Sequence, residues 1–355
     1  MSERWARQVV MAEIGADGQA RLARARVAVA GLGALGCAAA TALVRAGVGH
    51  LALIDPDTVS LPNLHRQSLY GDADIGRLKV EVAAERLRAA APDCELRPVP
   101  ERLDGSNAVA LLHGHEIVAD CTDNLAARYL VSDAAVILGI EDVMASALRF
   151  EGQLTVLGGE GPCYRCLFPE PPPPDAMPDC ATAGVLGSVT ATLGAMQAGE
   201  VIKRLLRIGR PLTGRLLLHD ALDAATRTIE VRRDPACRRC GPAADLFGVG
   251  LDAEPGELGP EELERLLASD EPPLILDVRT PWEFGQGHLP GSLFIPIDGL
   301  EARAGEVPRD RPIVAVCAHG IRSANAAFWL ALNGFRVRSL RGGLEAWRGE
   351  RVTRR

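Results

Sequence analysis

The chain has 355 residues, of which 47% are hydrophobic, and its formal net charge at pH 7 is −7. That length fits two domains with packed cores, and the acidic balance disfavours a nucleic-acid-binding protein, which usually carries a basic stripe. The first residues lack the apolar core of a signal peptide, and no segment reaches the roughly 18 apolar residues of a membrane span. We therefore expect a cytoplasmic protein that binds neither nucleic acid nor a membrane. Its nine cysteines indicate metal or catalytic chemistry rather than disulfides.

A strand, a glycine turn and a helix are predicted at residues 26–46. The turn contains Gly31, Gly33 and Gly36. In such units the first glycine makes a tight turn, the second lets a phosphate approach the backbone, and the third lets helix and strand pack closely. A second strand at 50–55 ends in Asp55, where a carboxylate can bind ribose hydroxyls. The pattern predicts a nucleotide site without saying which nucleotide binds.

The other elements of this part of the chain largely alternate between helix and strand. In chain order we expect a helical lead-in at 4–25, a helix at 76–91, strands at 96–99 and 117–121, a hairpin with strands at 145–150 and 153–157 turned at 151–152, an extended segment at 171–174, a helix at 187–206 and a strand at 215–219. Alternation of this kind predicts a parallel sheet. The hairpin predicts a mixed extension of that sheet.

Four polar residues follow the turn at the sheet edge where ligands bind in open α/β folds. They are Asn63, Arg66, Lys79 and Asp123. The cations would offset the charge of phosphates and the carboxylate would hold a metal, so the set fits a triphosphate with magnesium better than a dinucleotide. Any one of them is as often an ordinary surface residue, but four around one pocket favour a binding site. The glycine turn and Asp55 also permit a nicotinamide-dependent oxidoreductase, which is the alternative.

Two matched cysteine pairs indicate a metal site. Cys163 and Cys166 form one Cys-x-x-Cys motif, and Cys237 and Cys240 form another after 70 intervening residues. Four thiolates suit a tetrahedral zinc ion with no open position, so the site would be structural rather than catalytic. A redox dithiol and buried free cysteines are the alternatives, and the matched pairs favour zinc.

The composition changes after the second cysteine pair. Residues 243–259 are rich in Gly, Pro, Asp and Glu and predict a linker. A helix then begins at Pro260, with acids in its first turn. Buried strands at 274–278 and 313–316 and a helix at 323–332 follow. This pattern predicts a second, smaller α/β domain.

Two further cysteines are candidate nucleophiles. Cys317 follows a buried strand, and its loop contains Arg322 and leads into a helix. The N–H groups of the loop, the helix dipole and the arginine would stabilise a thiolate, and the tight loop suits a sulfur atom better than a phosphate. Cys180 lies in a polar, loop-like stretch, where a nucleophile and an inert buried cysteine are equally open interpretations.

These motifs resemble known families over nearly the whole chain. Residues 1–245 resemble the MoeB/ThiF family, the bacterial relatives of ubiquitin-activating enzymes. The resemblance is carried by residues 4–8, 31–36, 55–59, 63–67, 79 and 121–124 and by both cysteine pairs. Residues 259–355 resemble a rhodanese domain, through residues 276–279, 282–284, 287–291 and the Cys317 loop. With 246–258 as the linker, this fused order is that of MoeZ-type proteins.

The predicted fold class is therefore α/β. A Rossmann-like doubly wound sheet with a mixed extension and a four-cysteine zinc site is joined to a small α/β rhodanese domain. The resemblance also implies a homodimer, in which Arg7 reaches the nucleotide site of the neighbouring subunit.

The resemblance implies an ATP site in which Asp55 holds the ribose and Asp123 holds magnesium, while Asn63, Arg66 and Lys79 hold the phosphates. The residues implied to contact the nucleotide are Arg7, Gly31, Gly33, Ala34, Gly36, Asp55, Pro62, Asn63, Leu64, His65, Arg66, Gln67, Lys79, Asp123 and Asn124. The residues implied to take part in catalysis are Asp123, Cys180, Cys317 and Arg322.

A reaction follows from the same resemblance. The C-terminal Gly-Gly carboxylate of a ubiquitin-like sulfur carrier would attack the α-phosphate of ATP, giving an acyl-adenylate and pyrophosphate. Cys317 would take sulfur from thiosulfate or a cysteine desulfurase persulfide, and pass it on to give the carrier thiocarboxylate. Cys180 would attack the acyl-adenylate or take part in a transient acyl link.

The pathway favoured by the resemblance is molybdenum cofactor biosynthesis. Thiamine, tRNA thiolation, cysteine and siderophore pathways use the same chemistry and remain alternatives. A non-catalytic docking protein is a further alternative, which the presence of both Cys317 and Arg322 disfavours.

Overall fold

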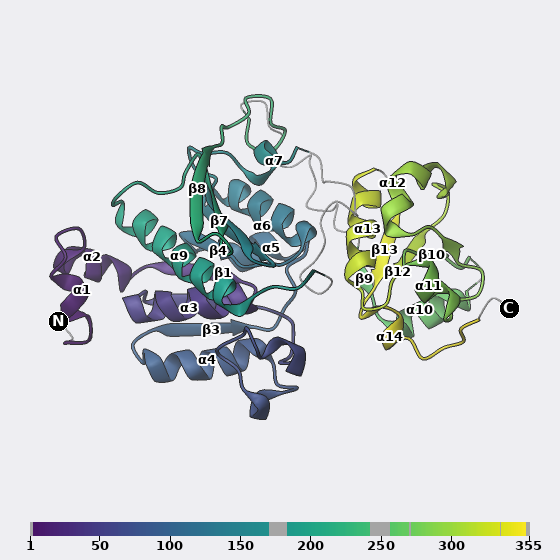
Figure 1. The fold of residues 1–355 in the computed structure, drawn as a ribbon, viewed down its shortest axis with the longest axis horizontal. Coiled ribbons are helices and arrows are strands. Elements are labelled where there is room, and N and C mark those ends of the chain that lie inside the picture. Colours follow the sequence, from purple (N-terminus) through teal and green to yellow (C-terminus); the bar gives the residue numbers. More distant parts are fainter. Residues whose placement is uncertain (1–2, 170–182, 242–255, 270, 334, 353–355) are drawn as a thin grey trace. The chain divides into compact units, whose positions relative to one another are not determined.

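The computed structural model describes residues 3–169, 183–241, 256–269, 271–333 and 335–352. The proline segment 171–174, Cys180 and most of the predicted linker fall outside these ranges. The chain forms two compact units, one built mainly from residues before 250 and the other mainly from residues 250–355. Each unit is described by itself (Figure 1).

The first unit is built on an eight-stranded sheet with the order β3-β2-β1-β4-β5-β6-β7-β8. The strands are β1 (Arg26–Ala30), β2 (His50–Ile54), β3 (Glu95–Val99), β4 (Ile117–Asp120), β5 (Glu141–Leu148), β6 (Glu151–Leu157), β7 (Arg215–Asp220) and β8 (Ala225–Glu230). From β3 to β5 the neighbours are parallel, and from β5 to β8 they are antiparallel. The predicted doubly wound sheet with a mixed extension is confirmed.

The register of the parallel strands brings three strand ends to one edge. Ala30, the last residue of β1, lies opposite Ile54 of β2 and Asp120 of β4. The strand order also reverses between β2 and β4 on the two sides of β1. Open α/β sheets bind ligands in the crevice at such a switch point.

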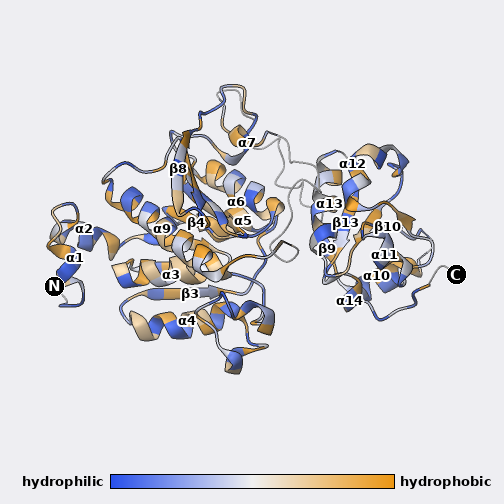
Figure 2. Cartoon of the chain, viewed as in Figure 1, coloured by the Kyte–Doolittle hydropathy of each residue, from blue (hydrophilic) through white to orange (hydrophobic). Residues whose placement is uncertain are grey.

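Helices cover this sheet. They are α1 (Ala6–Val9), α2 (Gly15–Leu22), α3 (Ala34–Ala46), α4 (Lys79–Ala90), α5 (Ala108–Leu112), α6 (Leu125–Leu138), α7 (Tyr164–Leu167) and α9 (Gly187–Leu206). Helix α3 packs against both α4 and α9, so these three share one face. The chain then crosses back over β1 to reach β4, and the right-handed rule for such crossovers places α5 and α6 on the other face. In Figure 2, α3 is almost wholly hydrophobic, whereas hydrophilic stripes alternate along α4.

The helical lead-in predicted at 4–25 consists of two short helices, α1 and α2. The hairpin differs from its prediction, because its first strand, β5, begins at Glu141 rather than at residue 145. The hairpin turns at Arg149, whose φ is +53°, and not at Glu151–Gly152. Gly152 instead belongs to β6, where it pairs with Ala147, and a Cβ there would lie 1.9 Å from Leu193 Cδ1 of α9. That glycine marks the close approach of a helix and not a turn.

The second unit is a five-stranded parallel sheet with the order β11-β10-β12-β13-β9. The strands are β9 (Glu257–Leu258), β10 (Leu274–Asp277), β11 (Leu293–Phe294), β12 (Ile313–Val316) and β13 (Val337–Leu340). The helices are α10 (Pro260–Leu267), α11 (Pro281–Gly285), α12 (Leu300–Arg303), α13 (Ile321–Leu332) and α14 (Gly343–Ala346). Hydrophobic clusters lie on both faces of this sheet, as expected for parallel strands.

We predict that Gly36→Ala lowers the free energy of unfolding by about 1–3 kcal/mol, the usual cost of overpacking. A Cβ at Gly36 would lie 1.9 Å from the carbonyl oxygen of Gly31, so α3 would have to move away from β1. Gly33→Ala is the matched control in the same turn, because its Cβ would meet no atom closer than 3.9 Å. Urea unfolding of both variants tests this, and equal stability of the two would contradict it.

Candidate functional site

The glycine turn leaves open space at its centre. Gly31 has a φ of +92°, and its N–H donates to the carbonyl of Ile54 over 2.8 Å. Gly33 begins α3 with an extended backbone, and the nearest atom to a Cβ there would be Gln67 Nε2 at 3.9 Å. The three predicted glycine roles, a tight turn, an open approach and close packing, therefore match the geometry of Gly31, Gly33 and Gly36.

Asp55 holds this turn in place by accepting two hydrogen bonds from backbone N–H groups. Its Oδ2 accepts the N–H of Leu32 at 2.6 Å, and its Oδ1 accepts the N–H of Asp57 at 2.8 Å. Burial raises the pKa of Asp55, and the charge of Lys79 opposes that effect. The sequence pointed to ribose binding but not to this second role, in which one carboxylate joins the ends of β1 and β2.

Lys79 is a buried cation beside the turn. Its Nζ lies 2.8 Å from Asp57 Oδ2 and 3.8 Å from Asp55 Oδ1. Burial lowers its pKa, but Asp55, Asp57 and Asp123 together outweigh burial and hold the pKa above its usual value. Lys79 therefore stays charged, and an arriving phosphate would compete with Asp57 for its ammonium group.

The polar loop after β2 is ordered by its own side chains. The Arg66 guanidinium donates to Asn63 Oδ1 at 2.6 Å and to the carbonyl of Pro62 at 3.2 Å, and it lies 2.8 Å from His65 Nε2. Leu64 packs against the hydrophobic core. A Cβ on Gly187, the first residue of α9, would lie 3.0 Å from the His65 carbonyl oxygen. The start of α9 therefore backs this loop.

Gln67 is the polar residue at the turn whose hydrogen bonding most clearly indicates a ligand site. Its side chain is buried, its Nε2 faces Gly33, and its Oε1 has no hydrogen-bond partner among the residues that the structure describes. A buried acceptor without a partner is costly. A donor from a bound ligand would remove that cost.

Asp123 and Asn124 follow β4 at the same edge, and Asp123 is exposed. Asp120 holds the preceding turn, because its Oδ1 accepts from the N–H and the hydroxyl of Thr122 at 2.8 and 2.6 Å. Arg7 is exposed on α1, and the contacts of the described residues do not link it to the glycine turn. Cys180 lies outside the described residues, so its predicted role is untested.

Two buried aspartates, Asp120 and Asp142, form an interacting pair that the sequence did not predict. Asp120 of β4 and Asp142 of β5 are both fully buried, and neither Oδ atom of Asp142 has a hydrogen-bond partner within the described ranges. Burial raises the pKa of Asp120 to about 6 and that of Asp142 well above its usual value. The charge of Arg128, from α6, lowers both values in part. Both carboxyls are therefore protonated more readily than an exposed aspartate, because burial disfavours their charged forms.

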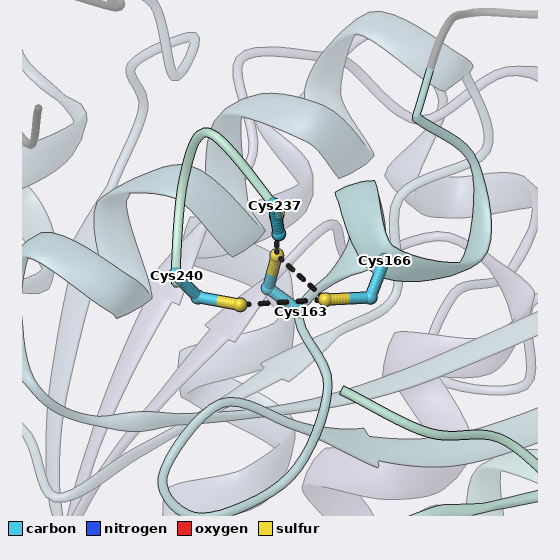
Figure 3. Close-up of side chains that lie close together, drawn as sticks. All are labelled: Cys163, Cys166, Cys237 and Cys240. Atoms are coloured by element: carbon cyan, nitrogen blue, oxygen red, sulfur yellow. Dashed lines mark hydrogen bonds between the residues drawn. The ribbon is translucent and has the colours of Figure 1, made fainter. Parts of the chain in front are cut away.

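The four paired cysteines meet in one cluster. Their sulfur atoms all lie within 4.8 Å of one another, and three of the four residues are buried (Figure 3). Cys163 Sγ lies 3.6 Å from Cys237 Sγ, and Cys166 Sγ lies 3.3 Å from Cys240 Sγ. Burial raises the pKa of the Cys163 and Cys166 thiols, so a cation is needed for four thiolates. The donor set and its closed geometry fit a tetrahedral metal ion.

Cys317 sits in a closed cradle at the end of β12. Its Sγ accepts the N–H of Gly320 at 3.1 Å and lies 3.4 Å from the Ser323 hydroxyl, which the Ser339 hydroxyl contacts at 2.9 Å. Gly320 has a φ of +96°, which a side chain would strain. A Cβ on Gly343 would lie 2.4 Å from the Cys317 carbonyl oxygen, so the start of α14 packs tightly on the loop.

Arg322 has a partner that the sequence did not reveal. Its two terminal nitrogens donate to the Glu283 carboxylate at 2.6 and 2.8 Å. Hydrogen bonding to Arg322 lowers the pKa of Glu283 to about 2. The positive charge expected beside Cys317 is therefore offset by a carboxylate from α11, and Arg322 also anchors the cradle to that helix.

The comparisons with known proteins agree with this geometry. The sequence model of the ThiF family matches residues 5–239, and that of the rhodanese-like domain matches residues 259–350. A Bos taurus protein named adenylyltransferase and sulfurtransferase MOCS3 is 42% identical over 385 residues, covering 97% of this chain and 85% of that protein. A Mycobacterium tuberculosis protein named "Probable adenylyltransferase/sulfurtransferase MoeZ" is 39% identical over 362 residues, covering 97% and 92%. E. coli MccB shares the fold, with a TM-score of 0.59 and 20% identity over 68% of this chain and 73% of that one.

The fold, the turn and the cysteine cradle together define an adenylyltransferase joined to a sulfurtransferase, which is how these relatives are named. The chain belongs to the ThiF family and carries a C-terminal rhodanese-like domain. None of the helices in the described part of the chain combines the length and apolar character needed to cross a bilayer.

We predict that Asp142→Asn is at least as stable as the wild type at pH 7.5, because burial raises the pKa of the Asp142 carboxyl. A carboxyl with a raised native pKa binds more protons folded than unfolded, so stability falls as pH rises above about 4. The amide removes this titration and imitates the protonated form. Urea unfolding between pH 5 and 8 tests this, and a destabilised variant with the wild-type pH slope would contradict it.

Glu283→Gln should behave in the opposite way. Because its native pKa is lowered to about 2, the Glu283 carboxylate contributes stability above pH 4.5 that is lost as pH falls towards 2. The variant should therefore be less stable than the wild type at pH 7 and equal to it at the acid end. Hydrogen exchange of α11 and α13 measures the stability of this unit separately from the other. A stability difference between the variant and the wild type that stayed the same from pH 7 to the acid end would refute the assignment.

Proposed function

We propose that this enzyme uses ATP to adenylylate the C-terminal carboxylate of a ubiquitin-like sulfur carrier ending in Gly-Gly, and then converts it to a thiocarboxylate with sulfur from Cys317. The observation that carries the proposal is the presence, in one chain of the ThiF family, of an open glycine turn beside a buried cation and a closed cradle around a thiol. A carboxylate is a poor electrophile, and AMP is a far better leaving group than oxide.

The nucleotide site would use the residues already gathered at the sheet edge. Gly33 and Ala34 would let the phosphates approach the start of α3, and Gln67 would accept a hydrogen bond from the ligand. Lys79 would leave Asp57 for a phosphate. Asn63, Arg66 and Asn124 would complete the phosphate contacts, and Asp55 would hold the ribose with its remaining lone pairs.

Asp123 would hold a magnesium ion, which supplies positive charge to the phosphates as pyrophosphate leaves. Its exposure on the loop after β4 and its electrostatic coupling to Lys79 support this role. Cys163, Cys166, Cys237 and Cys240 would hold a structural zinc ion, which joins α7 and the residue before it to the segment after β8.

Sulfur transfer would take place at Cys317. The Cys317 thiolate would attack the sulfane sulfur of thiosulfate or of a cysteine desulfurase persulfide, break the donor's S–S bond and release sulfite or the donor thiol. The N–H of Gly320 and the hydroxyl of Ser323 would then hold the charged sulfur of the persulfide on Cys317. The terminal sulfur would attack the acyl-adenylate carbonyl and release AMP, forming an acyl disulfide with Cys317. A second thiol would then cleave that disulfide and release the thiocarboxylate, and Cys180 is our candidate for an acyl or thiol role in these steps.

We further propose a cytoplasmic homodimer, in which Arg7 reaches the neighbouring nucleotide site, and domain limits of 1–245, 246–258 and 259–355. Molybdenum cofactor biosynthesis is the pathway we favour. The names of the MOCS3 and MoeZ relatives support the two activities and leave the carrier open, so thiamine, tRNA thiolation, cysteine and siderophore pathways are the alternatives that carrier capture would distinguish.

Lys79→Ala should reduce carrier-dependent exchange of radiolabelled pyrophosphate into ATP by about 100-fold or more, the usual loss for a group that stabilises developing charge. Arg88→Ala is the matched control, because Arg88 is an exposed cation on the same helix. Thermal unfolding of both variants checks folding. Wild-type exchange by a folded Lys79→Ala protein, or tighter binding of NADH than of ATP by the wild type, would overturn the proposed reaction.

Cys317→Ala should leave pyrophosphate exchange unchanged and abolish thiocarboxylate formation with thiosulfate as the sole donor. Cys94→Ala is the matched control, since Cys94 is another buried cysteine that the described contacts place in neither site. Mass spectrometry of the carrier measures the gain of one sulfur in place of one oxygen. A normal thiocarboxylate yield from Cys317→Ala would remove the sulfur-transfer role from this residue.

A further inference from the structure

Each Cys-x-x-Cys pair carries an arginine immediately before its second cysteine. Arg165 precedes Cys166 in one pair, and Arg239 precedes Cys240 in the other. Both arginines contact the same acceptor, Asp133 of α6. Asp133 is more than 100 residues before the second pair, so nothing local in the sequence links them.

The contacts divide both carboxylate oxygens between the two arginines. Arg165 donates from Nε to Oδ1 and Oδ2 at 3.0 and 3.1 Å, and from its terminal nitrogen to Oδ2 at 2.8 Å. Arg239 lies with Nε 3.0 Å from Oδ1 and donates from its terminal nitrogen to Oδ2 at 3.2 Å. One carboxylate thus bridges two segments that share no strand pairing.

Because its three side chains are largely buried, this bridge carries a desolvation cost. The Arg239 and Asp133 side chains are 0% and 3% exposed, and the Arg165 side chain is 12% exposed. Two guanidinium groups this close would repel each other in a medium of low dielectric constant if no anion lay between them. A shared carboxylate with several hydrogen bonds is the arrangement that makes such a pair tolerable.

Helix α6 also holds the first pair directly. Ser132 accepts the N–H of Tyr164 at 3.0 Å, and Arg165 stacks over the ring of Tyr129, 4.9 Å from its centroid. The second segment contacts these elements through its sulfurs, through packing on Val136 of α6 and through the N–H of Asp234, which donates to Cys166 Sγ at 3.4 Å. The Asp133 bridge adds the buried ion pair that ties this segment to α6.

We propose that Asp133 is the positioning residue of the metal site: it docks both cysteine pairs on α6 through their own arginines, and so assembles the four sulfurs before the metal binds. The inference rests on the metal site proposed above. Preassembly raises metal affinity because the ordering of the second segment is already complete. Losses of about 10- to 100-fold are typical when a partner behind a metal ligand is removed.

The test is metal affinity of the full chain after removal and return of metal. Asp133→Asn keeps an oxygen acceptor and the side-chain shape but removes the charge that joins the arginines. We expect zinc affinity, measured by competition with a chromophoric chelator, to fall by about 10- to 100-fold. At saturation the cobalt-substituted protein should keep the wild-type absorption of a tetrahedral thiolate site, because the four ligands are unchanged.

Asp74→Asn is the matched control. Asp74 is also a buried aspartate with two arginine partners, Arg77 and Arg86, but it lies among no cysteines. A general effect of losing such a group would lower the stability of both variants, whereas metal affinity should fall only in Asp133→Asn. If Asp133→Asn does not fold, Arg239→Lys is the second variant. It keeps the positive charge but loses the guanidinium group that contacts both carboxylate oxygens, and it should show the same loss of zinc affinity.

Three results would overturn the proposal. Wild-type zinc affinity in a folded Asp133→Asn protein would show that the bridge does not prepare the site. Higher affinity would show that the charge of Asp133, and not its docking, governs the metal. A wild-type chain that takes up neither zinc nor cobalt would remove the metal site itself, and this outcome is distinct because it appears before any substitution.

Discussion

The hydrogen bond from the Leu32 N–H to the buried carboxylate of Asp55 is the contact on which the nucleotide turn depends. It fixes the backbone immediately after Gly31, while a second bond from Asp57 ties the same carboxylate to the loop after β2. A buried carboxylate is costly without partners, and Lys79 supplies the opposite charge. Lys79, which is proposed to bind phosphate, therefore also neutralises the carboxylate that holds the turn.

Buried ion pairs also lie beside other loops of the chain. Asp133 bridges the two arginines beside the cysteine cluster, and Asp277 forms a bidentate pair with Arg279 at the end of β10. Isolated buried pairs often contribute little net stability, because desolvation offsets their attraction. In this chain each lies next to a segment that needs a defined position. We therefore attribute these pairs mainly to positioning.

Each of the two units provides the surroundings that one of the proposed reaction steps requires. The parallel sheet edge offers cations and open backbone to phosphates, whereas the cradle of Cys317 offers N–H and hydroxyl groups to one sulfur and leaves it 1% exposed. A persulfide needs such protection, and an acyl-adenylate needs a nearby sulfur nucleophile. Joining the two units in one chain raises the effective concentration of one reactant at the other.

The sequence by itself determined the glycine turn, the helix from Gly187 to Leu206 and the two cysteine pairs, because each depends on residues that are neighbours in the chain. The sequence did not reveal that Gly152 packs against α9, that the buried Asp142 interacts electrostatically with Asp120, or that Glu283 pairs with Arg322. Only the tertiary structure decided these contacts. The partners come from different strands and helices, so their pairing follows from which elements become neighbours in the folded chain, and no local pattern records that choice.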